Sequence, residues 1–79
     1  MEEFSTMHIR RIASELVDFI LVEDETGETV KLTPESHPEY FDNKEYRIDD
    51  QIFFDGVENT VIGITIRKNG TYVVAWTKY

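Results

Sequence analysis

The stretch DGVENTVIGITIRKNGTYVVAWTKY, residues 55–79, decides the fold because it predicts a β-hairpin. Its centre is Asn69-Gly70, a dipeptide favoured in two-residue type I′ turns because both turn residues need a positive φ. The flanking runs TVIGITIRK and TYVVAWTKY are rich in β-branched and aromatic residues, as strands are. We therefore expect two antiparallel strands joined at this dipeptide.

A two-residue loop fixes which residues face each other across the hairpin. It pairs Lys68 with Thr71, and the ladder then sets Gly63 opposite Trp76. Two sets of side chains share opposite faces: Ile62, Ile64, Ile66, Val73 and Ala75 on one, and Val61, Gly63, Thr65, Arg67, Tyr72, Val74 and Trp76 on the other. If the isoleucines point into the core, Tyr72 and Trp76 point outward. These rings then either are covered within the chain or meet a partner.

A second hairpin is predicted from VDFILVED into ETVKLTP. Gly27 suits the left-handed position of a three-residue loop with a bulge. That register sets Val22 opposite Val30 and Ile20 opposite Leu32.

The segments outside the two hairpins carry weaker signals. Residues 35–50 are polar and interrupted by Pro38, which predicts a turn or short helix near 39–43. QIFFD then starts another strand, with DGVEN as its exit. The N-terminal segment fits two patterns, a helix with one apolar face or an edge strand. We expect a strand, because no helix stop signal precedes VDFILVED.

Composition and charge limit the classes of protein to which this chain can belong. The 79 residues predict one domain, 1–79, and 41% hydrophobic and 30% charged residues are typical of a globular chain. Residues 15–58 hold 14 acids against three basic residues, a local charge of −11, whereas residues 59–79 contain no acid and carry +3. A protein partner with a basic surface is therefore expected, and direct binding to nucleic acid or to an anionic membrane is not.

The sequence also indicates a compartment. It contains no cysteine, so a disulfide framework is excluded. Glu2 and Glu3 stand where a secretory signal carries positive charge, and no apolar run reaches the roughly 20 residues of a membrane span. We expect a cytoplasmic protein.

The stretch YRIDDQIFFDGVENTVIGITIRKNGTYVVAW, residues 46–76, resembles the small SH3-like barrels, including KOW-type and phage-encoded members. Asp50, Gly56 and Gly63 stand where those patterns often carry Asp and Gly, whereas Asp49 replaces the Gly usual before Asp50. The resemblance covers about half the chain. It implies a small antiparallel barrel of five to six strands, completed by the N-terminal hairpin as in a permuted barrel. Family members bind proteins, nucleic acids or peptides, so it implies a binding module.

No group of residues predicts catalysis, and we expect a non-enzymatic protein without cofactor. His8 and His37 are the two histidines, and neither has a serine or cysteine nucleophile with an acid behind it in the sequence. Near His37, the acids Glu35, Glu39 and Asp42 match no zinc or EF-hand spacing. We expect no metal site.

The function expected is a protein-binding module that uses an acidic surface and an aromatic strand face. The candidate partner-binding residues are Tyr72, Trp76, Arg67, Val61, Asp49, Asp50, Asp55 and Glu58. The alternative is an acidic mimic of nucleic acid, a phage-type accessory protein that inhibits a DNA- or RNA-binding protein. Since the last strand, residues 71–79, ends the chain, we also expect it to offer an edge for homodimerisation.

Overall fold

The computed structural model describes residues 9–24 and 26–78, and this part of the chain is mainly β, as expected. Its seven strands exceed the five to six expected, and two short 3-10 helices accompany them. In chain order the elements are β1 (Arg11–Ala13), η2 (Ser14–Leu16), β2 (Val17–Glu23), β3 (Thr29–Leu32), η3 (Pro38–Tyr40), β4 (Glu45–Arg47), β5 (Gln51–Phe54), β6 (Val57–Ile66) and β7 (Tyr72–Thr77).

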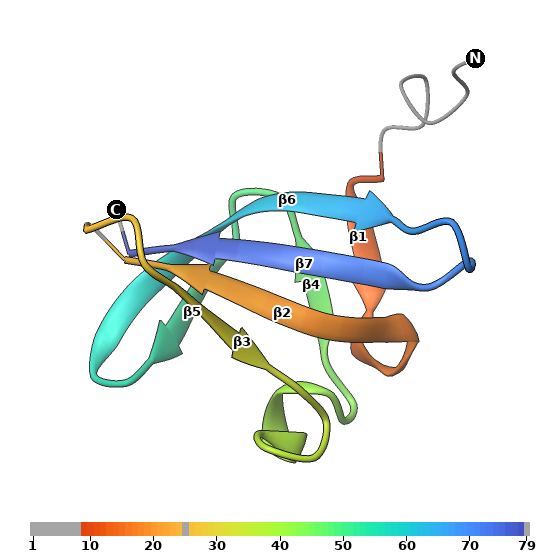
Figure 1. Ribbon diagram of the computed structural model, residues 1–79, viewed down its shortest axis with the longest axis horizontal. Helices are drawn as coiled ribbons and strands as arrows, with labels where there is room; N and C mark the ends of the chain where they lie inside the picture. The colour runs from red at the N-terminus through yellow and green to blue at the C-terminus, as the bar shows by residue number, and fades with distance from the viewer. Residues whose placement is uncertain (1–8, 25, 79) are drawn as a thin grey trace.

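The strands form two sheets rather than one closed ring. Five strands pair in the order β3-β2-β7-β6-β5, and β1 pairs with β4. In Figure 1, β1 and β4 cross behind the larger sheet. Its edge strands β3 and β5 do not pair with each other, so backbone pairing of the described strands does not close a barrel.

The pairing of β2 with β7 corrects two expectations. The two strands are parallel, so the sheet is not wholly antiparallel. Because β7 lies between β2 and β6, it is a central strand and not the exposed edge expected for homodimerisation. A parallel pair needs a long crossover instead of a tight turn, and here residues 24–71 supply it. No local turn signal in the sequence could therefore predict the parallel pairing of β2 with β7.

The β2–β3 hairpin has the predicted register. Val22 lies opposite Val30, and Ile20 lies opposite Leu32. Gly27 takes a φ of +87°, the left-handed conformation that the loop requires.

The β6–β7 hairpin has a different turn from the one predicted. The Arg67 N–H donates to the Thr71 carbonyl at 2.7 Å, so the loop has three residues and not two. Gly70 takes a φ of +89°, and Asn69 does not take the positive φ of a type I′ turn. Instead, the Asn69 Oδ1 accepts hydrogen bonds from the Thr71 N–H at 3.0 Å and the Thr71 hydroxyl at 2.7 Å. These bonds stabilise the longer loop.

The longer loop shifts the register by one residue. Ile66 now lies opposite Tyr72, and an irregularity between Val61 and Gly63 sets Val61 opposite Trp76. Ile62, which falls at this irregularity, is 51% exposed. A one-residue slip turns every side chain of a strand to the other face, so the predicted face assignment is reversed for β7.

A third hairpin, β5–β6, was not predicted. Asp55 and Gly56 take φ of +56° and +79°, the pattern of a type I′ turn, and Phe54 lies opposite Val57. Residues 55–59 were expected to be the exit from the QIFFD strand, yet β6 begins at Val57. The Asp-Gly dipeptide was the signal for this turn.

The space between the two sheets holds the core. Its buried residues come from both sheets and from the segment after η3: Ile12, Val17, Ile20, Val22, Leu32, Phe41, Tyr46, Val61, Val74 and Trp76. The segment around η3 packs against β5, where the ring centroids of His37 and Tyr40 lie 5.8 Å and 5.7 Å from that of Phe54. Side chains, not backbone pairing, thus complete the enclosure of the core.

The remaining local predictions have mixed outcomes. The strand expected near the N-terminus is confirmed for Arg11–Ala13, while residues 1–8 of that prediction lie outside the described residues. The turn or short helix expected near 39–43 is the 3-10 helix Pro38–Tyr40, whose next residue, Phe41, is buried.

The turn conformations predict a contrast between two glycines. We expect Gly56→Ala to lower the free energy of unfolding by about 1–2 kcal/mol, because a Cβ disfavours a positive φ. Gly63→Ala is the matched control, since Gly63 lies in a strand without a positive φ and an added Cβ would meet no atom within 4 Å. Urea unfolding of both variants measures the difference. Equal stabilities would contradict the type I′ turn at Asp55-Gly56.

Candidate functional site

Trp76 and Val61, expected on a partner-binding face, are fully buried. Both side chains have an exposed fraction of 0%. They face each other across β6 and β7, on the side of the sheet that covers the core. The three-residue loop is the physical reason for Trp76, and the irregularity between Val61 and Gly63 is the reason for Val61, so neither residue belongs to the candidate surface.

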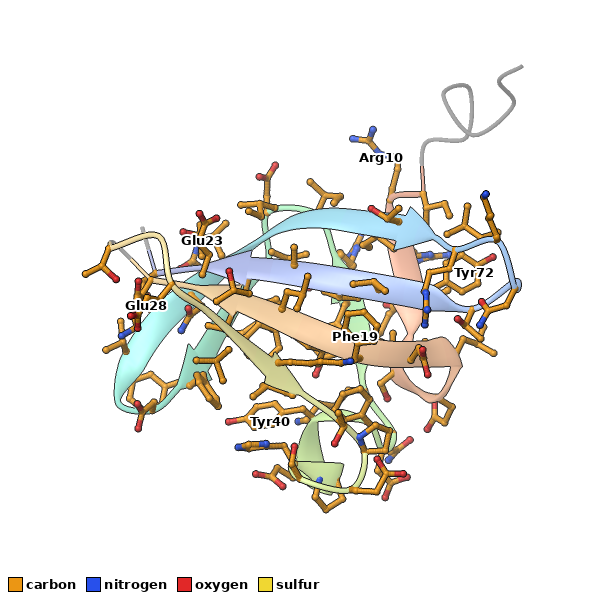
Figure 2. The ribbon with its side chains drawn as sticks, viewed as in Figure 1. Arg10, Phe19, Glu23, Glu28, Tyr40 and Tyr72 are labelled. Carbon is orange, nitrogen blue, oxygen red and sulfur yellow. The ribbon has the colours of Figure 1, made fainter. Side chains whose placement is uncertain are left out.

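Tyr72 and Arg67 are also engaged within the chain. Tyr72 is half-buried and packs against the core, at the opposite end of the sheet from Glu23 (Figure 2). The Arg67 guanidinium forms an ion pair with Asp18 and lies 5.3 Å from the centroid of the Phe19 ring. These partners were not predicted from the sequence, because Asp18 and Phe19 lie on β2, far from Arg67 along the chain.

The four predicted acids fall at the two ends of β5. Asp49 and Asp50 precede it in a turn closed by the Asp50 N–H, which donates to the Arg47 carbonyl at 3.0 Å. Asp55 and Glu58 belong to the hairpin at its other end. Asp49 takes a φ of +76°, the conformation that glycine adopts most easily. Asp49 therefore stands at a position that glycine would occupy without a steric penalty.

The β5–β6 hairpin brings two of these acids beside an exposed aromatic residue. Phe53 is 67% exposed and lies directly opposite Glu58 across the ladder. Val57, also exposed, follows the turn that contains Asp55. We call Phe53, Asp55 and Glu58 the acidic tip; Val57 lies opposite Phe54 and so belongs to the other face of the hairpin. The acidic tip is the candidate functional site.

Phe53 was not among the residues predicted from the sequence. The signal was the consecutive pair Phe53-Phe54, because neighbouring residues of a strand point to opposite faces and only one of the two rings can face the core. Phe54 is the inner ring, since its centroid lies 5.8 Å from that of Trp76.

Several acids outside the acidic tip have structural partners. Glu15 accepts a hydrogen bond from the Asn43 N–H at 2.6 Å, and this bond lowers the pKa of its carboxyl. Glu45 lies 3.9 Å from Arg11. No ion pair or side-chain hydrogen bond joins Asp55 or Glu58 to another described residue. Their charges are therefore available to a partner.

The described residues show neither a pocket nor a group of metal-binding side chains. The Ser36 hydroxyl lies 2.8 Å from Nδ1 of His37, but it also contacts Thr33 and so belongs to the turn that follows β3. No carboxylate is hydrogen-bonded to His37 among the residues described. The expectations of no metal, no cofactor and no catalysis stay predictions.

The described part of the chain contains no helix with the length and apolar character needed to span a membrane. Comparison of the chain with protein-family models, with curated proteins and with solved structures finds no match. The geometry of the chain itself therefore has to support any statement about function.

The position of Trp76 predicts a loss of folding when its ring is removed. Trp76→Ala should cost about 3–5 kcal/mol, because it leaves a large cavity, and a domain of this size has about the same net stability. We expect no cooperative thermal transition by circular dichroism. Ile62→Ala, on an exposed residue, is the control and should unfold almost as the native chain does. Strong quenching of native Trp76 fluorescence by acrylamide would contradict its burial.

A pH dependence follows from the carboxylates that hold turns. Asp24 Oδ1 accepts hydrogen bonds from the Thr26 hydroxyl at 2.6 Å and from the N–H groups of Thr26 and Glu28, and the hydroxyl bond is the largest cause of its lowered pKa. A pKa lowered by folding stabilises the native state above the ordinary value, 3.8, and this stability is lost as the pH falls through the lowered value.

Two variants test this dependence. Asp24→Asn keeps the acceptor oxygen but cannot titrate, and Thr26→Val removes the largest cause of the shift. Both should lose less stability than the native chain between neutral and acidic pH. Melting temperatures across a pH series measure the loss. Identical acid sensitivity in all three chains would show that Asp24 does not contribute.

Proposed function

We propose that this chain is a non-enzymatic protein-binding module that contacts a basic partner through the acidic tip. The observation that carries the proposal is the exposed Phe53 beside Asp55 and Glu58, two carboxylates without partners among the described residues. An aromatic ring that is largely solvent-exposed on a small domain favours contact with another molecule. The acidic tip thus replaces the Trp76 face in the function expected from sequence.

The two parts of the acidic tip have different physical roles. Its carboxylates, with Asp49 and Asp50 at the other end of β5, lie within the region that carries −11 and attract a basic surface over long distances. Phe53 supplies apolar area that is buried on contact and so lengthens the lifetime of the complex. We therefore expect charge to control association and Phe53 to control dissociation.

Imitation of nucleic acid is the second candidate function, and the same acids support it. The exposed ring of Phe53 favours the first candidate, because a groove that binds phosphates offers positive charge rather than an apolar pocket. We further propose that the fold is a variant of the SH3-like barrel acting in the cytoplasm. The paired sheets around one core and the Asp49 turn support this relationship.

The test begins with capture of partners on the immobilised chain and continues with association and dissociation rates across a salt series. The double variant Asp49→Gly/Asp55→Asn removes two charges while keeping favourable turns, because Gly adopts a positive φ easily and Asn-Gly suits a type I′ turn. It should slow association about tenfold at low salt. Phe53→Ala should mainly speed dissociation, also by about tenfold. Glu58→Asp, which keeps the charge, is the control and should leave association unchanged.

The outcomes separate the two candidate functions. A captured protein that binds no nucleic acid, together with the expected rate changes, supports the protein-binding module. Capture of a nucleic-acid-binding protein that DNA displaces supports imitation of nucleic acid. Association and dissociation rates that are unchanged by Phe53→Ala, by the double charge variant and by salt would exclude the acidic tip as the contact surface.

A further inference from the structure

The two edges of the five-stranded sheet differ in how they are covered. On β5, the carbonyl of Phe53 points away from β6 and accepts a hydrogen bond from the Tyr40 hydroxyl at 3.3 Å. The η3 segment therefore covers this edge. At the other edge lies β3, which pairs with β2 and with no further strand of residues 9–24 and 26–78.

The register shows which backbone groups of β3 face outward. The Asp24 N–H donates to the Glu28 carbonyl, so the hydrogen-bonded pairs of this ladder continue at Val30 and Leu32. The N–H and carbonyl groups of Thr29 and Lys31 then point away from β2. Both residues are exposed, and no strand of the described chain pairs with them on that side.

The usual protection of an edge strand is weak here. A lysine on an edge normally hinders the approach of another strand. The Lys31 ammonium, however, lies 4.4 Å from the centroid of the Phe19 ring, on the outer face of the sheet, and not across the edge. Val30, between the two outward-facing residues, is 52% exposed. An extended chain thus has access to β3.

The charge around β3 indicates which kind of chain can bind at this edge. Glu28 precedes the strand, and Glu35 and Glu39 follow it in the turn and in η3. Figure 2 shows Glu28 at the same end of the sheet as Glu23, which lies opposite Thr29. A second copy of a chain with a net charge of −8 is repelled from such an edge. A basic segment is attracted to it.

We propose that β3 binds an extended basic peptide, which adds to the five-stranded sheet as a further strand. Backbone hydrogen bonds to Thr29 and Lys31 give the contact its geometry, and the flanking glutamates favour lysine or arginine side chains. This surface lies at the opposite edge of the sheet from the acidic tip, so the inference goes beyond the proposed function and can fail without it.

The experiment uses the full chain and an acetylated peptide of alternating threonine and lysine. Binding is followed by NMR, and amide hydrogen exchange reports the edge directly. We expect the Thr29 and Lys31 amides to exchange fast in the free chain and to become protected with the peptide, while Val30 is protected in both states. The same peptide N-methylated on one edge should bind about tenfold more weakly or not at all, because it lacks the donors. A peptide of alternating threonine and glutamate should not bind.

A pair of variants at Thr29 separates backbone hydrogen bonding to the peptide from electrostatic attraction between the peptide and the acidic chain. Thr29→Pro removes an outward N–H at a position where an edge strand tolerates proline, and should weaken binding about tenfold. Thr29→Val keeps the N–H and should bind as the native chain does. Spectra of both variants in the absence of peptide establish that they are folded.

Three results would overturn the proposal. They are equal binding by the native chain and a folded Thr29→Pro variant, absence of protection at Thr29 and Lys31, or self-association of the chain through β3 in place of peptide binding. If a partner binds through the acidic tip but the basic peptide does not protect Thr29 and Lys31, the proposed function stands and the β3 inference fails. If the peptide binds at β3 but no partner binds through the acidic tip, the β3 inference stands and the proposed function fails.

Discussion

The fold depends on the packing of a single ring, that of Trp76. Its centroid lies 5.5 Å from Tyr40, 5.8 Å from Tyr46 and 5.8 Å from Phe54, so one side chain of β7 joins the η3 segment, β4 and β5. Among the described residues, the indole N–H is buried without a hydrogen-bond partner, which is an unfavourable contribution. The ring therefore contributes through its packing. The edges of the two sheets do not pair to close a barrel, and this aromatic cluster holds the described sheets together.

Local turn chemistry explains which parts of this fold the sequence could predict. Gly27 and its flanking strands specified the β2–β3 register, because a left-handed residue is needed at one position of that loop. At Asn69-Gly70 the sequence fits both a two-residue and a three-residue loop, and in the longer loop the side chain of Asn69 accepts two hydrogen bonds from Thr71. One residue of slip then turned Trp76 inward. The parallel pairing of β2 with β7 joins segments far apart in sequence, where no turn signal exists.

Only part of the candidate site could be predicted from the sequence, because the face on which a strand residue lies depends on the turns. Asp55 and Glu58 were identified from charge, which depends on composition alone and survives an error of register. Trp76 and Val61 were assigned from the faces of their strands, and those assignments changed with the longer loop for Trp76 and with the irregularity in β6 for Val61. Phe53 was missed because its exposure depends on β5 pairing with β6 across Asp55-Gly56. Predictions that rest on charge are thus more robust than those that rest on strand parity.

The two aspartates at positive φ connect the stability of the fold with its charge. Glycine would adopt the conformations of Asp49 and Asp55 without a steric penalty, whereas an ordinary side chain loses about 1–2 kcal/mol there. In a domain whose net stability is only about 3–5 kcal/mol, such a loss is substantial. Aspartate tolerates this region of positive φ better than most residues, and Asp-Gly is a preferred pair in a type I′ turn, so the cost at Asp49 and Asp55 is smaller than for an ordinary side chain. The two turns can therefore place a carboxylate at each end of β5 without a large loss of stability.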